Sequence, residues 1–429
     1  MQKFKLLPIT VAVAASLASL SSFAADTNIE ALEKRIQELE SKVVDIDYVN
    51  DQQPAVLTAE TKVPDGIVFS GYARYGAHYK SGDERYVDIG TTGRSVGRLG
   101  NEANGGEVQL AKLFQADNGA IWDVVFMADH WEADAWADDG GLSMKKMYAG
   151  VTNVFESQPE LYMWAGRDFH QRPQQGLNDY FWMTHDGQGA GFNNLDFGGA
   201  KLDMGFVGQV KGGLVNDNGR YAITSKLHSI NAGIGQLDLY ANYGFASDEA
   251  DSDVAGDPKV SDETAYLVGA TLGLGESNKL VVKYGDGADS SVYDLKGDYQ
   301  TLYASVEGSY AASEQFIIDY LVSYKDNSGS DLDRENTEYA GIVRPQYQWD
   351  DVHSTWLEAG YGMVDYDDDG EENAWKVTLS QNVSLGGLPW SRPMLRFYTT
   401  VGDVETKGNT VKTTNVDTLS FGAMFEAWW

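Results

Sequence analysis

Few residue patterns in this sequence could do chemistry, and most of them are weak. Residues Asp365–Gly370 resemble the start of a calcium-binding EF-hand loop, but the twelfth position holds Lys376 rather than Glu. Residues Gly187–Gly191 are rich in glycine, but no βαβ unit surrounds them that could bind a nucleotide phosphate. Cysteine is absent, and the six His residues show no nucleophile–base spacing. We therefore expect a protein that is not an enzyme and needs no metal or cofactor, with residues 365–370 in a solvated hairpin loop.

The composition narrows the class of protein and its partners. Lys and Arg number 32 against 64 Asp and Glu among 429 residues, a formal net charge of -32, so nucleic acid is excluded as a partner. The chain is 42% hydrophobic and 12% aromatic, which argues against disorder. Its mean hydropathy of -0.36 is typical of a soluble protein. A membrane barrel gives the same average, because its polar inner face cancels its apolar outer face.

Residues 1–24 have the features of a secretory signal peptide. Lys3 and Lys5 precede an apolar stretch, Leu6–Leu20, and small residues at Ser22 and Ala24 predict cleavage after Ala24. The apolar stretch is shorter than the roughly 20 residues that a membrane anchor needs. No later window has 18 consecutive apolar residues, so we expect no transmembrane helix in the mature chain.

Residues 25–50 carry the pattern of a short coiled coil. Apolar residues recur at alternating spacings of three and four: Ile29, Leu32, Ile36, Leu39, Val43 and Ile46. On a parallel neighbour Arg35 would meet Glu40 and Lys42 would meet Asp47, so the pattern predicts parallel self-association. The rule leaves the number of chains open. A single amphipathic helix packed on the rest of the chain is the alternative interpretation.

A linker at residues 51–66 leads to residues 67–429, where apolar and polar side chains alternate. At the end of the chain one face holds Leu419, Phe421, Ala423, Phe425, Ala427 and Trp429. Such alternation predicts strands with one apolar and one polar face. A soluble sandwich would fit, but the signal peptide, the length and the aromatic strand ends favour a transmembrane β-barrel. We expect roughly 18 antiparallel strands, although the periodicity alone does not separate 16 from 18.

Several blocks in this region are specific enough for comparison with known families. The longest runs from Trp164 to Asp196, and shorter ones are Gly71–Arg74, Arg98–Glu102, Trp390–Pro393 and Trp428–Trp429. Together they resemble the maltoporin (LamB-type) family of sugar-specific porins, and the coiled coil before them resembles its sucrose-porin branch. The resemblance implies an eighteen-stranded barrel that forms homotrimers in the bacterial outer membrane. It also implies one outer loop folded inward as a constriction. Because both ends of the barrel segment should lie on the periplasmic side, we expect the coiled coil in the periplasm.

The same resemblance implies an aromatic track along the pore at Tyr72, Trp390 and Trp428. Trp131 matches a loop aromatic that reaches into the mouth of the neighbouring subunit. Aromatic rings bind the flat C–H faces of a pyranose, whereas charged side chains bind its hydroxyl groups. The alternation of side chains along a strand supports an inward orientation for two of these rings. Tyr72 shares a face with Arg74, and Trp428 lies on the polar face of its strand. The alternative is that the rings face lipid headgroups.

A polar track accompanies the aromatic one in the family. Its positions match Arg74, Arg98, Arg172 and Asp179, and Phe181 lies where the constriction commonly has Tyr. For each charged residue, an ordinary ion pair of the barrel wall is the alternative interpretation.

Two positions depart from the family pattern: Glu107 takes the place of a stacking Tyr, and Ser277 that of a Phe. A carboxylate offers no apolar plane, and we expect Glu107 to lie near Arg74 and Arg98 and to neutralise them partly. The sequence therefore predicts a channel for sugar-selective diffusion with weak affinity for long maltodextrins and some cation preference. The alternative is a general diffusion porin of the same fold with little sugar selectivity.

Overall fold

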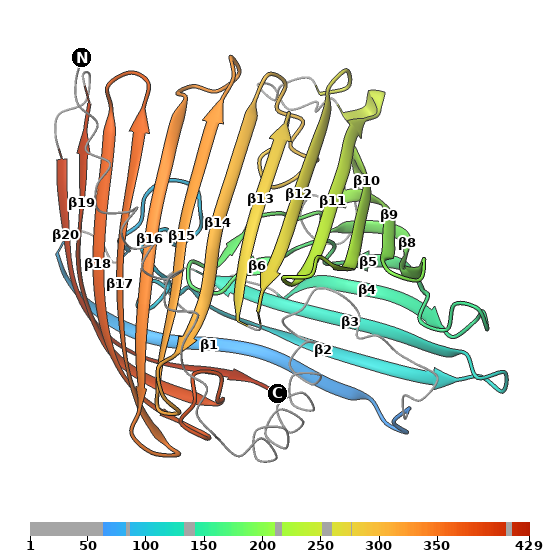
Figure 1. The fold of residues 1–429 in the computed structure, drawn as a ribbon, viewed down its shortest axis with the longest axis horizontal. Helices are drawn as coiled ribbons and strands as arrows, with labels where there is room; N and C mark the ends of the chain where they lie inside the picture. Colours follow the sequence, from blue (N-terminus) through green and yellow to red (C-terminus); the bar gives the residue numbers. More distant parts are fainter. Residues whose placement is uncertain are drawn as a thin grey trace. The chain divides into compact units, whose positions relative to one another are not determined.

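The structure is a computed structural model that describes residues 63–82, 86–132, 142–210, 217–250, 260–275, 277–408 and 414–429. The predicted signal peptide, coiled coil and most of the linker lie outside these residues. Within them, 18 strands form one antiparallel sheet in which each strand pairs with the strands before and after it. The first strand also pairs with the last, so the sheet closes into a barrel (Figure 1). The predicted barrel and its number of strands are confirmed.

The barrel strands follow one another around the wall. They are β1 (Val68–Gly82), β2 (Asn104–Gln115), β3 (Ile121–Glu132), β4 (Ser143–Thr152), β5 (Tyr162–Asp168), β8 (Gly187–Asp196), β9 (Lys201–Val210), β10 (Asp217–Asn231), β11 (Gln236–Ala246), β12 (Thr264–Leu274), β13 (Asn278–Asp286), β14 (Gln300–Ala311), β15 (Phe316–Ser328), β16 (Asn336–Gln348), β17 (His353–Tyr366), β18 (Glu371–Ser384), β19 (Met394–Lys407) and β20 (Thr414–Trp428). A separate two-stranded sheet pairs β6 (Gln174–Gln175) with β7 (Tyr180–Phe181). The described part also contains a short 3-10 helix, η1 (Asp248–Ala250), and no helix there is long and apolar enough to cross a membrane.

The alternation of side chains explains why the chain closes in this form. Along β17, Trp356 and Glu358 are buried towards the inside, whereas Leu357 is 39% and Tyr361 54% exposed on the outside. The same alternation continues around the wall and gives an apolar outer surface and a polar inner surface. In a bilayer only a closed barrel of this kind pairs every strand's backbone groups while it presents apolar side chains to lipid.

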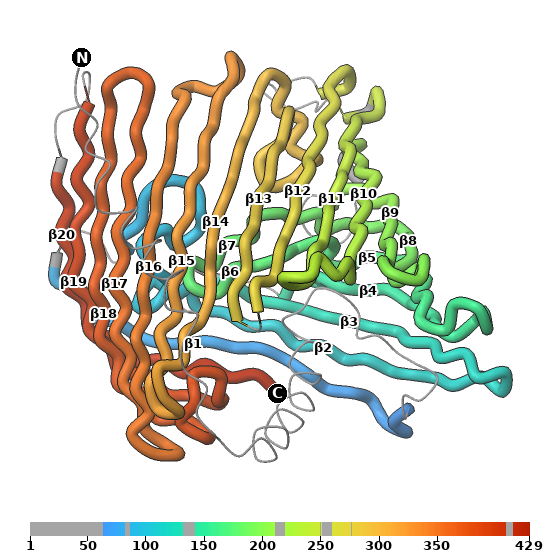
Figure 2. The backbone as a smooth tube through the Cα atoms, viewed as in Figure 1, coloured from blue at the N-terminus to red at the C-terminus, as the bar shows by residue number. Residues whose placement is uncertain are grey.

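The connections differ between the two rims of the barrel. On the rim where β1 begins and β20 ends, several turns are short, such as residues 197–200, 232–235 and 312–315. The opposite rim carries the longest of the described connections, residues 86–103, 169–186 and 287–299. Figure 2 traces the backbone of the strands that they join. We call the first the short-turn rim and the second the long-loop rim.

Three of the described connections fold from the long-loop rim into the barrel: residues 86–103, 169–186 and 287–299. Backbone hydrogen bonds join the first two, from Arg94 N to Asn178 O at 2.5 Å and from Arg98 N to Leu177 O at 2.8 Å. The second and third are joined from Thr184 N to Ser290 O at 2.8 Å. The expectation of one inward loop is therefore wrong. Three segments that are joined by hydrogen bonds lie inside the barrel wall.

Segment 86–103 is fixed to the wall by a buried cluster of charges. The carboxylate of Glu358 accepts from the backbone N–H of Leu99 at 2.9 Å, from Lys376 at 2.9 Å and from Arg344 at 2.9 Å. The ammonium of Lys376 also donates to the carbonyls of Gly97 and Leu99, both at 2.6 Å. Gly97 has a φ of +106°, and a Cβ there would collide with Glu358. The segment is thus held against the strands by charge-assisted hydrogen bonds.

Replacement of the central carboxylate tests this attachment. Glu358→Gln leaves the cations of Lys376 and Arg344 buried without their counter-charge, which costs about 3–5 kcal/mol in comparable buried pairs. We expect a lower temperature of unfolding in detergent and a larger, noisier single-channel conductance, because segment 86–103 detaches. Glu405→Gln, which alters the more exposed pair with Lys407, is the matched control. An unchanged conductance in the Glu358 variant would show that this cluster does not hold the segment.

Candidate functional site

Aromatic side chains from three strands meet on one part of the inner wall. Tyr72 of β1 and Trp428 of β20 are cross-strand partners, with ring centroids 6.4 Å apart and planes 22° apart. On the other side of Tyr72 lies Trp131 of β3, at 5.9 Å and 25°. We call Trp131, Tyr72 and Trp428 the aromatic row. The row lies on the polar inner face, since Tyr72 is 9% exposed and donates from its hydroxyl to Glu426 at 2.7 Å.

Trp131 differs from its expected position. It belongs to β3 rather than to an outer loop, and its ring packs within the same chain against Tyr72 and 5.0 Å from the Arg74 guanidinium carbon. The pairing of β3 with β2 explains this, because it sets Trp131 opposite Gly105, where no side chain separates the indole from the neighbouring strands. In this structure Trp131 therefore completes the row of its own subunit.

Trp390 lies apart from the row, in the connection between β18 and β19, and is 41% exposed. The same connection reaches the row through Arg392, whose guanidinium carbon lies 4.2 Å from the centre of the Trp428 ring. Guanidinium groups therefore flank the row at both ends, Arg74 beside Trp131 and Arg392 beside Trp428. These are favourable cation–π positions.

The cations around the row are paired with acids. Arg74 donates to Asp179 at 2.8 Å, and Gln174 donates to the other oxygen of Asp179 at 2.5 Å. Arg98 lies 3.4 Å from Glu426, a residue that the sequence analysis did not single out. Glu426 is 1% exposed. The sequence could have pointed to Glu426, because it lies two residues before Trp428 on the same polar face of β20.

Arg172 occupies the inward segment 169–186. Its guanidinium carbon lies 4.2 Å from the centre of the Phe169 ring and 4.1 Å from that of Phe181, and it pairs with Asp186 at 3.3 Å. Phe181 thus provides a ring surface for Arg172 within the inward segment. Because the ring has no hydroxyl group, this contact depends on the face of the ring alone.

Glu107 is on the inner wall, in a different charged environment from the one expected. It pairs across strands with Tyr72 on one side and Asp129 on the other. The cations that act on its carboxylate are Arg172 and Lys146. Arg74 and Arg98 are instead matched by Asp179 and Glu426, so the expected neutralisation by Glu107 is wrong.

Of the ten predicted site residues, the structure brings nine to the inner wall and the inward segments, and Trp390 to the short-turn rim. The aromatic members were assigned from the resemblance to the family, and the alternation of side chains along the strands supported Tyr72 and Trp428 independently. Glu426, which accepts from the hydroxyl of Tyr72, comes from a distant part of the chain, so this contact could not be predicted from local sequence. In this arrangement flat rings lie beside paired guanidinium and carboxylate groups, so the wall can contact a ligand with both an apolar face and a hydroxyl rim.

The fold and this inner wall define a class of protein. A closed barrel with an apolar exterior, a polar interior and segments folded into its lumen has the architecture of an outer-membrane porin, and the family match makes this chain an outer-membrane diffusion channel and not an enzyme. Residues 67–429 match the family model described as LamB porin, and the chain belongs to this family.

Solved structures agree with the fold. Over 90% of this chain and 97% of the other, it is similar to OccD3 (OpdP) of Pseudomonas aeruginosa, with a TM-score of 0.52 and 10% identity. Wzi of Escherichia coli, an outer-membrane protein involved in capsule assembly, is more distant: TM-score 0.42, 11% identity, 83% of each chain. The trimer form of OmpT of Vibrio cholerae has a TM-score of 0.40 and 12% identity over 85% of this chain and 99% of the other. At these identities the likeness concerns the fold alone.

The ion pair that ties segment 169–186 to β1 has a defined pH dependence. Burial would raise the pKa of the Asp179 carboxyl, but Arg74 and Arg98 hold that pKa below its usual range. A carboxyl with a lowered pKa stabilises the folded state above its ordinary pKa of about 3.9, and this contribution is lost as the pH falls towards the folded value. The Arg74–Asp179 pair therefore helps to hold the segment at neutral pH, and this contribution is lost in acid.

We expect current fluctuations of the wild-type channel to rise only below about pH 4, whereas Asp179→Asn fluctuates across the range from neutral to acid. Single-channel recordings at a series of pH values measure this difference. Asp117→Asn, in an exposed turn on the short-turn rim, is the control for nonspecific acid effects. Identical pH profiles for wild type and Asp179→Asn would contradict the prediction.

Proposed function

We propose that this channel mediates the facilitated, sugar-selective diffusion of carbohydrates across the outer membrane. The aromatic row on the inner wall is the observation that supports the proposal. A pyranose has flat C–H faces that pack on aromatic rings and a rim of hydroxyl groups that accept and donate hydrogen bonds. The row supplies the rings, and the adjoining Arg74, Asp179 and Arg98 supply the polar partners.

The pairing of these charges favours weak binding of a sugar over tight binding. Arg74 and Arg98 already have carboxylate partners, so a sugar hydroxyl replaces or shares an existing hydrogen bond instead of meeting a bare charge. Conduction requires sites that are favourable enough to enter and weak enough to leave.

At both positions that depart from the family pattern, this chain has a side chain without an aromatic ring. Glu107 stands beside Tyr72 on the inner wall, where it offers hydrogen-bond acceptors but no ring face. Ser277 lies in the turn between β12 and β13 and also offers no ring. We therefore infer weak affinity for long maltodextrins.

We further propose that the channel is a homotrimer with lipid around its outer wall, and that residues 25–50 form a parallel coiled coil on the periplasmic side. The apolar outer surface of the described strands supports the contact with lipid. The pairing of Arg35 with Glu40 and of Lys42 with Asp47 supports the coiled coil.

The central experiment is a titration of the purified full chain in planar bilayers with maltose, sucrose and a series of β-glucosides. Saturable block of the ion current by one of these sugars supports selective binding. Conductance that none of them blocks in a saturable way would favour the alternative, a general diffusion porin of the same fold.

Loss of one ring of the row should weaken this block. A stacked aromatic contact contributes on the order of 1 kcal/mol, so Trp428→Leu should lower sugar affinity about fivefold while small-ion conductance stays equal or rises. Phe421→Leu changes a ring on the outer face of the same strand and is the matched control. Equal sugar affinity in both variants would show that Trp428 is not on the sugar path.

Restoration of a ring at Glu107 should have the opposite effect. Glu107→Tyr adds an apolar plane next to Tyr72, and we expect a several-fold gain in maltodextrin affinity. Current block by maltodextrins of increasing length, compared between wild type and variant, measures the gain. Glu107→Gln separates the loss of charge from the gain of a ring. Equal or weaker block in the Tyr variant would place Glu107 off the sugar path.

A further inference from the structure

The guanidinium groups around Glu426 outnumber the carboxylates that pair with them. Glu426 accepts from Arg392 at 2.8 Å, from Arg396 at the same oxygen, and from Arg98 at 3.4 Å. Glu102 also accepts from Arg396, at 2.6 Å. Three cations therefore share two carboxylates, which leaves a surplus of one positive charge beside the aromatic row.

A second surplus lies behind the inward segment that carries Arg98. Glu358 pairs with both Lys376 and Arg344, each at 2.9 Å. The same carboxylate accepts from the backbone N–H of Leu99, the residue after Arg98. The segment therefore runs between two sites at which the cations outnumber the carboxylates.

Two of the three guanidinium groups at Glu426 are held by partners within the chain. The side chain of Arg396 is 1% exposed and lies between Glu102 and Glu426. The side chain of Arg392 is 4% exposed, and its Nη1 donates to the carbonyl of Pro389 at 2.8 Å. Both groups therefore offer almost no surface to a molecule in the lumen.

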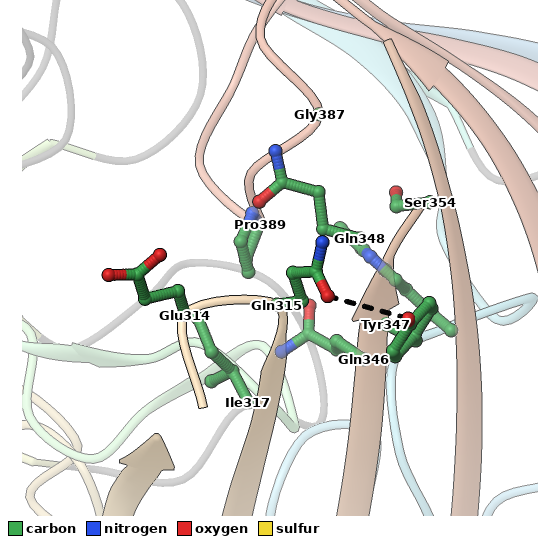
Figure 3. A pocket seen from close by; sticks show the side chains of 10 residues that line it. Glu314, Gln315, Ile317, Gln346, Tyr347, Gln348, Ser354, Gly387 and Pro389 are labelled. Carbon is green, nitrogen blue, oxygen red and sulfur yellow. Dashed lines mark hydrogen bonds between the residues drawn. The ribbon is translucent and has the colours of Figure 1, made fainter. Parts of the chain in front are cut away.

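The connection between β18 and β19 is itself held against the wall. Pro389 lies at a small pocket together with Gln315, Gln346 and Gln348, as Figure 3 shows. Gln348 also donates to the carbonyl of Gly386 at 3.4 Å, which attaches the start of the connection to β16. The void in this pocket is about 10 Å³, far below the volume of a sugar ring, so the pocket is a packing contact and not a sugar site.

Arg98 is the guanidinium at this site that a molecule in the lumen can reach. Its side chain is 16% exposed, the most of the three, and its hydrogen-bond acceptor among the described residues is Glu426, at 3.4 Å. A strong charge-assisted hydrogen bond is shorter, at roughly 2.7–2.9 Å. Tyr72 donates to the same oxygen of Glu426 at 2.7 Å, so the guanidinium lies beside the hydroxyl end of this ring. A weakly held cation thus stands at the edge of the aromatic row.

The charges along the row differ between its two sides. Glu107 is the cross-strand partner of Tyr72 on β2, whereas Trp428 is its partner on β20. A carboxylate therefore lies on one side of Tyr72, and the cations Arg392 and Arg98 lie on the other, towards β20. An anionic group on a sugar is attracted to the side of Trp428 and repelled from the side of Glu107.

We propose that the channel prefers acidic sugars, and that Arg98 binds the carboxylate of a uronate whose pyranose ring packs on Tyr72 and Trp428. The inference rests on the proposed sugar-selective function and names its substrate class. A uronate carries a carboxylate at C5 in place of the hydroxymethyl group of a hexose, on the rim of the ring and away from its flat C–H faces. This carboxylate compensates the surplus positive charge and can accept two hydrogen bonds from one guanidinium.

The test compares glucuronate with glucose as blockers of the ion current in planar bilayers, at neutral pH and constant ionic strength. The two sugars share a ring and differ in the group at C5. We expect glucuronate to half-block the wild-type channel at a concentration about tenfold lower, since a charge-assisted hydrogen bond is stronger than a neutral one. Arg98→Gln should remove most of this difference. Arg94→Gln makes the same change of charge in the same segment, where Arg94 pairs with Asp88 at 3.4 Å, and as the matched control it should keep the difference.

The methyl ester of glucuronate keeps the test decisive if Arg98→Gln does not fold, because it removes the charge from the ligand and leaves the channel unchanged. The ester should block the wild-type channel no better than glucose. Block by acetate equal to that by glucuronate would contradict the proposal, since the site would then bind anions without recognising a sugar. The same preference for glucuronate in Arg98→Gln as in wild type would also contradict it.

Two further outcomes separate this inference from the proposed function. If glucose or maltose blocks the channel in a saturable way and glucuronate is no better, sugar selectivity stands and the preference for acidic sugars fails. If no sugar blocks the wild-type channel, neutral or acidic, the proposed function itself fails, and the carboxylate site with it.

Discussion

The interior of this barrel depends on the carboxylate of Glu426. A buried carboxylate is costly unless several donors surround it, and Glu426 has donors from four places in the chain. Tyr72 donates to it from β1, Arg98 from segment 86–103, Arg392 from the connection at the short-turn rim, and Arg396 from β19. One buried charge thus fixes the middle of the aromatic row, one inward segment and the connection that carries Trp390.

Glu358 plays a parallel part on the opposite side of segment 86–103. It fixes the backbone at Leu99, while Glu426 fixes the side chain of Arg98, the preceding residue. The cations at these two sites outnumber the carboxylates: Arg98, Arg392 and Arg396 surround Glu426, and Arg344 and Lys376 surround Glu358. The net charge of the chain is therefore a poor guide to the charge that a permeating molecule meets at this level of the channel.

The sequence predicted the strands and the parity of their side chains well, because a period of two is a local property. Tyr72 and Trp428 were assigned to the polar face of their strands from neighbours within a few residues. The inward position of segments 86–103 and 287–299 could not be predicted in this way. It depends on contacts such as that of Leu99 with Glu358, which join parts of the chain that are remote in sequence. The charged neighbours of Glu107 could not be predicted for the same reason, because they come from remote parts of the chain.

The aromatic row also depends on the closure of the sheet. It combines β1 and β20, the first and last strands, so it exists only when the sheet has closed. A ligand that spans Tyr72 and Trp428 binds the closed barrel and not a partly inserted chain, and it stabilises closure by mass action. The proposed sugar site therefore also lies where the sheet closes, so a ligand bound there would report that a barrel has been completed.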